Sequence, residues 1–407
     1  MAERRTFVIV GASLAGAKAA EALREEGFDG RVVLVGAESH RPYERPPLSK
    51  GYLQGEAERD SVYVHPEGFY AEQEIELLRG REVTAIDAGA RTATLSDGES
   101  LRWDRLLLAT GAAPRTLPIP GADLEGVHVL RTLDDSDRLR DVIGAGGRLL
   151  VIGAGWIGSE VAASARSGGM EVTIVEQQSV PLQGVLGSEV GGMYAGVHRD
   201  HGVELLTGAG VDAIEGDGRA ERVRLAGGRT VDCAAVVIGV GAAPRTELAE
   251  AAGLPVDNGV LVDATLSAGG DVFAAGDVAN AEHPFFGRRV RVEHWANALN
   301  QGPAAARSML GRTEPYERLP YFFSDQYDVG MEYSGLADPD APVVVRGDLA
   351  SREAVVFWLG DDGAVLAGMN INVWDVNEQV QALIRSRAAV DPARLADPAV
   401  PLEELSG

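Results

Sequence analysis

The sequence predicts an α/β fold in which two doubly wound domains, the second inserted in the first, precede a smaller α+β domain with an antiparallel sheet. An apolar strand, a glycine-rich turn and an alanine-rich helix follow one another twice, beginning in residues 7–16 and again in 149–158. The sequence of residues 111–116 also recurs at 241–246, each time after an apolar strand. Near Leu319 the alternation of strands and helices gives way to several short strands.

The first doubly wound unit is interrupted. Its opening strand, Thr6–Val10, leads through a glycine turn and a helix to a second strand, Arg31–Val35. Its closing segment, 271–277, arrives only after the second unit has ended. We therefore expect one domain from 1–112 and 242–318, a second from 113–241, and a C-terminal domain from 319–407.

The last domain shows the pattern of an antiparallel sheet followed by a helix. The expected strands are Asp325–Tyr333, Val343–Arg346, Ala354–Leu359 and Val365–Ile371, and the expected helix is Val376–Ser386.

Charge and composition exclude several classes of function. The formal net charge of −24 argues against a nucleic-acid-binding surface. The N-terminus enters a strand with no room for a signal sequence, and the longest nearly apolar run, 233–244, is too short to cross a bilayer. The one cysteine, Cys233, suits a reducing compartment. We expect a cytoplasmic protein without a membrane segment, a nucleic-acid partner or a metal site.

The glycine turns have the pattern of dinucleotide-binding turns. In such a turn the first glycine permits a sharp bend, the second lets backbone approach a pyrophosphate, and the third lets the helix pack on the strand. The helix N-terminus then offers free N–H groups to the phosphates. The turn residues are Gly11, Ser13 and Gly16 in the first copy and Gly153, Gly155 and Gly158 in the second. The serine is a departure, because its Cβ crowds the pyrophosphate. A single such turn is often only a tight strand–helix connection, but two in the same context favour nucleotide binding.

Each second strand is followed by an acid that can accept hydrogen bonds from an adenosine ribose, Glu38 in the first copy and Glu176 in the second. Either could instead be a solvated carboxylate at a strand end. At Glu176 a carboxylate repels the 2′-phosphate of NADP, and Gln177 and Gln178 supply no arginine to bind it. The sequence therefore predicts NADH in preference to NADPH.

Several segments together resemble one family. They are Arg41-Pro-Tyr-Glu-Arg-Pro-Pro-Leu-Ser-Lys50, Ala109-Thr-Gly111, the Ala-Gly-Asp at 275–277, Val292-Glu-His-Trp-Ala-Asn-Ala-Leu-Asn-Gln-Gly302 and Tyr321-Phe-Phe-Ser-Asp-Gln-Tyr327. In this order they resemble the ferredoxin reductases of bacterial cytochrome P450 systems and aromatic-ring dioxygenases. The resemblance covers nearly the whole chain. It implies FAD in the first domain, NADH in the inserted one, and electron transfer to a [2Fe–2S] ferredoxin.

The resemblance also implies roles for individual residues. Arg45 and Lys50 lie in the segment that contacts the flavin, Asp277 binds its ribitol, and backbone near Trp295 faces its polar edge. Lys50 corresponds to the lysine beside flavin N5, and Glu160 to its partner beside the nicotinamide. The catalytic candidates are thus Lys50, Glu160 and Trp295, and the remaining cofactor-binding candidates are Val83, Ala109, Arg131, Ile157 and Gly241.

Plainer readings exist for the same side chains. Lys50 could be a surface lysine, Glu160 a first-turn helix acid favoured by the dipole, and Asp277 a helix N-cap. Trp295 could be ordinary core. One departure also affects NADH binding, because relatives often carry an arginine where Gln183 or Gly184 stands.

The missing cysteines narrow the chemistry. A cysteine pair near the flavin would be needed to reduce disulfides, and only Cys233 exists, which we interpret as a packing residue. Oxygen- or peroxide-reducing relatives use one cysteine soon after the first ribose acid, and residues 41–50 contain none. The electrons must therefore pass to a carrier that comes to the flavin.

The densest basic cluster, Arg288, Arg289 and Arg291, precedes the flavin-edge segment and is a candidate docking site for an acidic ferredoxin, or else a solvated run of arginines. Two alternatives stay open. One is a rubredoxin reductase or NADH oxidase on the same scaffold. The other is a non-enzymatic redox sensor that responds to NADH, resembling apoptosis-inducing factor.

Overall fold

The computed structural model describes residues 4–405 and divides into two compact units. Of the described residues, unit 1 comprises 4–45, 58–113 and 242–320, and unit 2 comprises 46–57, 114–241 and 321–405. The chain passes from unit 1 to unit 2 at β8 (Ala112–Pro114) and returns just before β17 (Ala242–Pro244). The short segment that carries Lys50 belongs to unit 2.

A six-stranded sheet forms the centre of unit 1, in the order β19-β20-β7-β1-β2-β3. Neighbouring strands from β20 to β3 pair in parallel, and β19 pairs antiparallel with β20. The inner strands are short, mostly apolar runs, and β1 is buried from Phe7 to Val10. The strands are β1 (Thr6–Val10), β2 (Arg31–Gly36), β3 (Ile75–Arg79), β7 (Arg105–Leu108), β19 (Ser267–Gly269) and β20 (Val272–Ala274).

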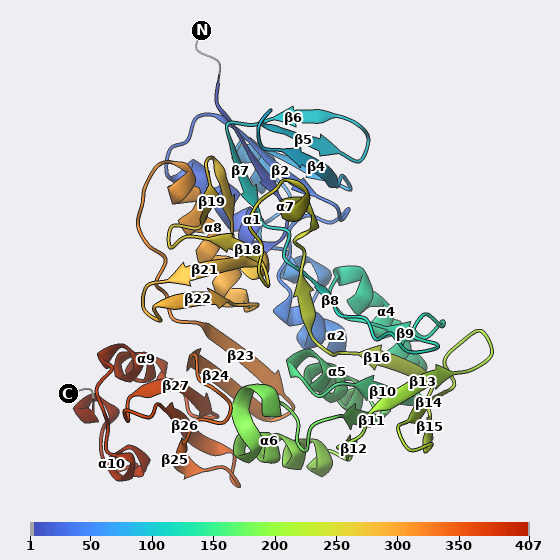
Figure 1. Ribbon diagram of the computed structural model, residues 1–407. Coiled ribbons are helices and arrows are strands. Elements are labelled where there is room, and N and C mark those ends of the chain that lie inside the picture. The colour runs from blue at the N-terminus through green and yellow to red at the C-terminus, as the bar shows by residue number, and fades with distance from the viewer. Residues whose placement is uncertain (1–3, 406–407) are drawn as a thin grey trace. The chain divides into compact units, whose positions relative to one another are not determined.

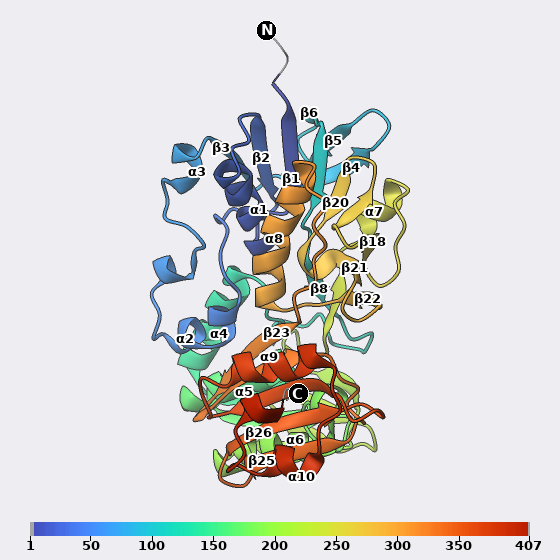
Figure 2. The same ribbon diagram turned by 90° about the vertical axis from the view of Figure 1, so that its left-hand side faces the viewer.

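The helices α1 (Leu14–Glu25) and α8 (Trp295–Met309) pack side by side in unit 1, as Figures 1 and 2 show. Small residues make this close packing possible. A Cβ on Gly302 would lie 2.3 Å from the carbonyl oxygen of Ala15, so only glycine fits there. The N-termini of both helices are thereby fixed by the fold of unit 1.

Two three-stranded sheets complete unit 1, in the orders β4-β5-β6 and β18-β21-β22. Their strands are β4 (Val83–Asp87), β5 (Thr92–Leu95), β6 (Ser100–Arg102), β18 (Val260–Val262), β21 (Ala279–His283) and β22 (Arg288–Arg291). The remaining helices are η2 (Arg59–Val62), α3 (Phe69–Glu72), α7 (Glu247–Ala251) and η3 (Gly276–Val278).

Unit 2 contains a second parallel sheet, in the order β12-β11-β10-β16-β9, and a small antiparallel sheet, β13-β14-β15. The strands are β9 (Val127–His128), β10 (Arg148–Ile152), β11 (Glu171–Glu176), β12 (Glu204–Thr207), β13 (Val211–Glu215), β14 (Arg222–Leu225), β15 (Thr230–Asp232) and β16 (Ala235–Ile238). The helices are η1 (Pro46–Ser49), α2 (Gly51–Gln54), α4 (Leu133–Ala145), α5 (Trp156–Ser167) and α6 (Gln183–Asp200), the last with a kink at Gly187.

The C-terminal part of unit 2 is a five-stranded antiparallel sheet in the order β23-β24-β27-β26-β25. Its elements are β23 (Tyr321–Gln326), β24 (Val329–Gly335), β25 (Val343–Asp348), β26 (Glu353–Leu359), β27 (Val365–Ile371), α9 (Asn377–Ser386), α10 (Pro392–Ala396) and η4 (Leu402–Leu405). The prediction of a single strand at Asp325–Tyr333 is wrong. A hairpin turns there, with Tyr327 at φ 56° between β23 and β24.

The C-terminal sheet shares an apolar core with α6, which includes Leu186, Val190 and Tyr194 on the helix and Met331 and Trp358 on the sheet. The second doubly wound fold and the last domain therefore form one body. Across residues 4–405, every helix is too short or too polar to cross a membrane.

Candidate active site

The first glycine turn joins β1 to α1 in unit 1. Gly11 has φ +116°, and a Cβ there would lie 2.1 Å from the carbonyl oxygen of Ala109. A Cβ on Gly16 would lie 2.0 Å from the carbonyl oxygen of Gly11. The two glycines are therefore required by the sharp turn and by the packing of helix on strand.

Ser13, at the middle position of this turn, is the N-cap of α1, but its side chain makes no capping hydrogen bond to the helix. Its Oγ instead accepts a hydrogen bond of 2.7 Å from Nη1 of Arg45. The predicted cofactor residue Arg45 is thus held at the first turn, where its charge adds to that of the helix N-terminus.

The acid after β2, Glu38, accepts a 2.5 Å hydrogen bond from the hydroxyl of Tyr43. Tyr43 is buried and lies within the segment quoted for the family resemblance. The hydrogen bond fixes one carboxylate oxygen of Glu38 at the end of the strand. The sequence analysis did not predict a role for Tyr43. Its position five residues after Glu38 was the signal that could have suggested one.

The second glycine turn joins β10 to α5 in unit 2 and has the same geometry. Gly153 has φ +97°, and a Cβ on Gly158 would lie 2.1 Å from the carbonyl oxygen of Gly153. At Gly155 an added Cβ would meet only the carbonyl oxygen of Gly239, at 4.0 Å. This open space, at a helix N-terminus that no side chain of the described chain caps, fits the approach of a pyrophosphate.

Glu176 ends β11 beside the second turn. Its Oε2 accepts a 2.7 Å hydrogen bond from the backbone N–H of Ala154, and its Oε1 accepts one of 2.8 Å from that of Gln178. The carboxylate is therefore held rigidly next to the turn. Gln183, where relatives often carry arginine, accepts hydrogen bonds from Ser179 through its side-chain oxygen. Ile157, in the first turn of α5, is 44% exposed, which is high for a large apolar residue.

Lys50 and Glu160 form a buried ion pair in unit 2, with 2.8 Å between Nζ and Oε2. Their side chains are 15% and 5% exposed. Glu160 also accepts hydrogen bonds from two hydroxyls that the sequence analysis did not single out, Ser49 Oγ at 2.5 Å and Ser324 Oγ at 2.7 Å. Both serines lie in segments quoted for the resemblance, so their position was the available signal.

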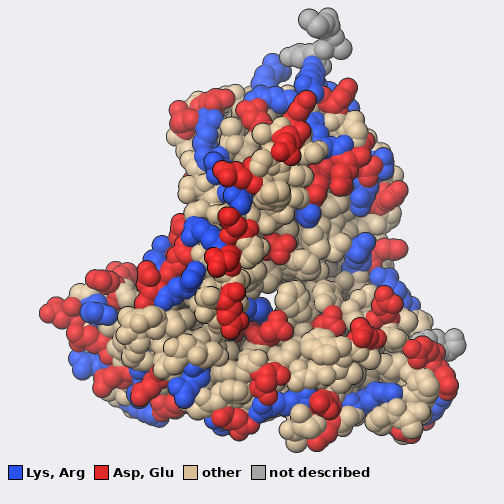
Figure 3. All heavy atoms as spheres, turned by 180° about the vertical axis from the view of Figure 1, so that it is seen from behind, with Lys and Arg blue, Asp and Glu red and all other residues tan. Residues whose placement is uncertain are grey.

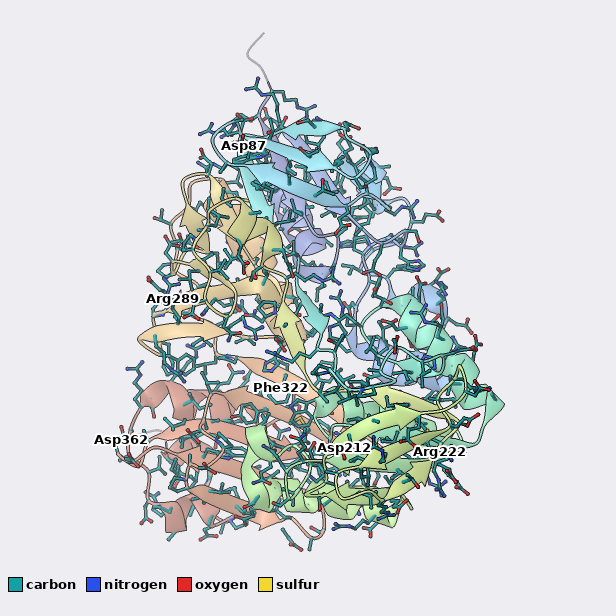
Figure 4. All side chains as sticks on the ribbon, turned by 45° about the vertical axis from the view of Figure 1, so that its right-hand side comes forward. Asp87, Asp212, Arg222, Arg289, Phe322 and Asp362 are labelled. Atoms are coloured by element: carbon teal, nitrogen blue, oxygen red, sulfur yellow. The ribbon has the colours of Figure 1, made fainter. Side chains whose placement is uncertain are left out.

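An aromatic side chain completes the surroundings of the ion pair. The ammonium of Lys50 lies 5.6 Å from the ring centre of Phe323 on β23. The neighbouring Phe322, labelled in Figure 4, points into the core against Trp156 and Tyr333. Strand β23 therefore presents Phe323 and Ser324 to different partners, Lys50 and Glu160.

The N-terminus of α8 in unit 1 carries Trp295 at its first position, with His294 as N-cap. Burial raises the pKa of Glu44, and Trp295 and Lys18 act on that pKa in the opposite direction. Burial lowers the pKa of His294 to about 4, against the attraction of Asp277. Asp277 lies in η3, and its carbonyl oxygen accepts a hydrogen bond from Arg291.

The remaining predicted residues are divided between the units. Val83, at the start of β4, and Ala109, just after β7, are buried in unit 1. Arg131 and Gly241 belong to unit 2, where the backbone of Arg131 bonds to Asp135 and the carbonyl of Gly241 accepts from the N–H of Arg115. The structure brings Lys50 and Glu160 together, and Arg45 with Ser13, while the roles of the others stay predictions.

Cys233 lies between β15 and β16. Burial raises its pKa to about 11, with Asp232 acting in the same direction, so at neutral pH the group is a thiol. A cavity of about 390 Å³ in unit 1 lies between the second half of α8 and residues 312–318, and none of the predicted site residues lines it.

Comparison with known proteins identifies the family of the chain. Residues 5–302 match the family described as pyridine nucleotide-disulphide oxidoreductase, and residues 321–406 match the family described as reductase C-terminal. The chain belongs to the pyridine nucleotide-disulphide oxidoreductase family. It is thus an oxidoreductase, and the predicted fold class and the two predicted cofactors, FAD and NADH, are confirmed.

Individual relatives of this oxidoreductase are similar over nearly the full length. Putidaredoxin reductase of Pseudomonas putida is 38% identical over 405 residues, covering 98% of this chain and 96% of that protein. Rhodocoxin reductase of Rhodococcus erythropolis is 40% identical over 354 residues, covering 86% and 83%. The crystal structure of a covalent putidaredoxin reductase–putidaredoxin complex matches with a TM-score of 0.94 at 38% identity, covering 98% of both chains. A ferredoxin reductase from Rhodopseudomonas palustris matches with a TM-score of 0.95 at 35% identity, covering 99% and 100%.

Proposed function

We propose that this oxidoreductase passes electrons from NADH through FAD to a [2Fe–2S] ferredoxin, and that the ferredoxin serves a cytochrome P450 or a ring-hydroxylating dioxygenase. Similar proteins bear names of this kind, among them the ferredoxin–NAD(+) reductase component of an anthranilate dioxygenase system from Burkholderia cepacia, which is 39% identical. One similar structure is a complex with putidaredoxin.

The observation that carries the proposal is the single cysteine. Although the family is named for disulphide chemistry, Cys233 is the only cysteine of the chain, and its raised pKa keeps it a thiol. The chain therefore has no dithiol to receive electrons from the flavin. An external acceptor must take them.

FAD supplies the change from a two-electron donor to one-electron acceptors, and the chain supplies position and charge. Ser13, Arg45 and the N-terminus of α1 would hold the FAD pyrophosphate. Lys50 would lie beside flavin N5, where its ammonium stabilises developing negative charge. Glu160, on the helix that follows the NADH turn, would orient that ammonium and face the nicotinamide.

The preference for NADH over NADPH is supported by Glu176. Its two backbone hydrogen bonds hold the carboxylate beside Ala154, so it has little freedom to move away from a 2′-phosphate. The same rigidity suits a carboxylate that accepts both ribose hydroxyls.

The proposed docking site for the ferredoxin is the cluster Arg288, Arg289 and Arg291 on β22. In unit 1, Arg289 pairs with Glu282 at 2.8 Å, and Arg291 pairs with Glu293 at 2.5 Å. Arg289 lies on the β21–β22 hairpin in Figure 4. Arg288 is exposed, so it is the member that we expect to contribute most to attraction of an acidic partner.

The domain roles and the compartment are part of the same proposal. Residues 1–112 and 242–318 would bind FAD, 113–241 would bind NADH, and 319–407 would be the reductase C-terminal domain. The proposed compartment is the cytoplasm, which suits a protein with one reduced cysteine.

The test begins with the visible spectrum of the purified protein. NADH is added without air, followed by cytochrome c with and without a [2Fe–2S] ferredoxin. We expect the flavin band to bleach and cytochrome c reduction to depend on the ferredoxin. Bleaching without a response to any ferredoxin would contradict the proposed partner. It would favour the alternative functions, an NADH oxidase or a redox sensor. A protein that cannot take up FAD would contradict the whole proposal.

A further inference from the structure

Strand β23 carries two buried polar side chains on one face. Ser324 and Gln326 are two residues apart, so both point to the same side of the strand, and they are 2% and 1% exposed. Ser324 Oγ lies 2.7 Å from Glu160 Oε1. An ionised carboxylate only accepts hydrogen bonds, so the hydroxyl proton of Ser324 must point to Glu160.

This direction fixes the next hydrogen bond. Since the proton of Ser324 is used on Glu160, its oxygen is left to accept, and the side-chain amide of Gln326 donates to it from Nε2 at 3.4 Å. The amide oxygen of Gln326 therefore points away from Ser324. This oxygen is buried and has no partner of standard geometry within the described chain.

His198 on α6 faces that amide. The imidazole is fully buried, and its Nε2 likewise has no partner of standard geometry in the described residues. The side chain of Gln326 lies close enough to His198 to act on its pKa, which it raises, although burial is the larger effect and lowers that pKa to about 4. Since the amide nitrogen of Gln326 is used on Ser324, the amide oxygen is the atom left to accept a proton from Nε2 of His198.

The other nitrogen of the ring meets Tyr327. The hydroxyl of Tyr327 lies 3.4 Å from His198 Nδ1. If Nε2 carries the proton that faces Gln326, then Nδ1 is an acceptor and Tyr327 is the donor. Beyond this point the ring of Tyr327 stacks on His201 at 3.8 Å, and His201 lies 3.5 Å from the exposed Asp328.

We propose that Tyr327, His198, Gln326 and Ser324 form a chain of hydrogen bonds in which every donor points toward Glu160, and that this chain orients the Glu160 carboxylate toward Lys50. The proposal rests on the function given above to the Lys50–Glu160 pair. Hydrogen bonds that are aligned in one direction polarise each other and add to the stabilisation of the charge at their end.

Ser324, Gln326 and His198 are thus positioning residues for the hydride-transfer site. The Glu160 side chain is 5% exposed, and a carboxylate is costly to bury to this extent unless donors and a cation satisfy it. Ser49 and Lys50 come from one segment and contact Oε2 of Glu160. The hydrogen-bond chain from β23 and α6 donates to the other carboxylate oxygen, Oε1, through Ser324. The C-terminal domain thereby contributes to the geometry of the nicotinamide side.

The test uses the FAD-loaded protein and two independent measurements. The first is the tautomer of His198, read from the nitrogen chemical shifts of ¹⁵N-histidine-labelled protein. The chain contains seven histidines, and the signal of His198 is assigned by its loss in His198→Gln. We expect a neutral ring protonated at Nε2. A ring protonated at Nδ1 would overturn the proposal.

The second measurement compares Ser324→Ala with Ser324→Thr, which keeps the hydroxyl. We expect the alanine variant to lower the limiting rate of flavin bleaching by NADH about 10- to 100-fold, as the loss of a hydrogen bond to a charged group predicts. The apparent NADH affinity should change little, and the threonine variant should recover most of the rate. Equal rates in the two variants would sink the positioning role.

Matched tyrosine variants test the far end of the chain. Tyr327→Phe removes the distal donor, whereas Tyr194→Phe removes a buried hydroxyl that has no partner among the described residues, on the same helix as His198. Only Tyr327→Phe should shift the His198 nitrogen signals. If Lys50→Met and Glu160→Gln leave flavin bleaching unchanged while the His198 tautomer is as expected, the assigned function of the ion pair fails and the hydrogen-bond chain stands.

Discussion

Nη1 of Arg45 donates a 2.7 Å hydrogen bond to Oγ of Ser13, the residue that replaces the middle glycine of the first turn. The serine was expected to crowd a pyrophosphate. Its hydroxyl anchors a guanidinium at the turn, so the departure from the glycine pattern is accompanied by an added positive charge.

Replacing Arg45 should weaken FAD binding. We expect Arg45→Gln to lower FAD affinity about 10- to 100-fold, because the loss of a charged hydrogen bond to phosphate costs about 1.5–3 kcal/mol. The measurement is a titration of the FAD-free protein with FAD, in which the quenching of flavin fluorescence reports binding. Ser13→Ala removes only the anchor, so its loss should be smaller. An unchanged affinity in Arg45→Gln would place the pyrophosphate elsewhere.

Replacing Glu176 should relax the choice of coenzyme. In Glu176→Gln the side-chain oxygen can still accept from Ala154, but the negative charge is gone. We expect the ratio of kcat/KM for NADH to that for NADPH to fall at least about tenfold, which corresponds to about 1.4 kcal/mol. Steady-state rates with each coenzyme give the ratio. As a control, Glu171→Gln changes an exposed acid of the same strand that pairs with Arg148. It should leave the ratio unchanged.

The sequence predicted most of the fold because its signals are local. The strand, glycine turn and helix of each doubly wound unit are encoded within about thirty residues. The hairpin at Tyr327 was missed because Asp325–Tyr333 alternates as one strand would, and only a positive φ at a tyrosine reveals the turn.

The site was predictable only in part, for a related reason. Lys50 and Glu160 lie in separate motifs that the resemblance could pair. Ser324 reaches Glu160 because β23 packs against α5, and Gln326 follows Ser324 on the same strand. Such contacts between distant segments leave no local pattern. The charges of the docking cluster were missed for a different reason, because a sequence does not show which nearby acid an arginine pairs with. Glu282 pairs with Arg289 across the β21–β22 hairpin, and Glu293 pairs with Arg291 two residues away.

Reversing the charge of Arg288 should slow reduction of the ferredoxin. On the face shown in Figure 3, basic and acidic side chains are interspersed, which agrees with a steering field that is local rather than general. We expect Arg288→Glu to raise the apparent KM for an acidic ferredoxin several-fold at low salt, with the difference shrinking as ionic strength rises. Rates of cytochrome c reduction at several salt concentrations measure it.

Controls for the docking prediction separate steering from structure. Arg222, which pairs with Glu215 on the sheet β13-β14-β15, is a comparable exposed arginine of unit 2. Arg222→Glu should leave the KM for ferredoxin unchanged. Arg291→Glu is unsuitable as a test of docking, because that side chain is 12% exposed and bonds to the backbone of Asp277. Equal effects of Arg288→Glu and Arg222→Glu would remove β22 as the docking site.

Buried histidines should make the protein sensitive to mild acid. Burial lowers the pKa of His198 to about 4, with Gln326 acting to raise it and His201 to lower it, while the same group in the unfolded chain titrates near its ordinary value of 6.5. Between these two values the unfolded chain binds a proton that the folded protein does not. Unfolding therefore becomes easier as pH falls from 6.5 toward 4, and the loss ends below 4, where both states are protonated.

The magnitude follows from the same linkage. At pH 5 the single group should cost about 2 kcal/mol of stability relative to neutral pH, and His294, whose pKa is also about 4, should add a similar loss. We expect the melting temperature of the wild type to drop more between pH 7 and pH 5 than that of His198→Gln, in which a neutral amide replaces the imidazole. An NMR titration of the His198 ring provides the direct check. A midpoint near 6.5 would show that protonation costs the folded state nothing, and the acid sensitivity would then have another source.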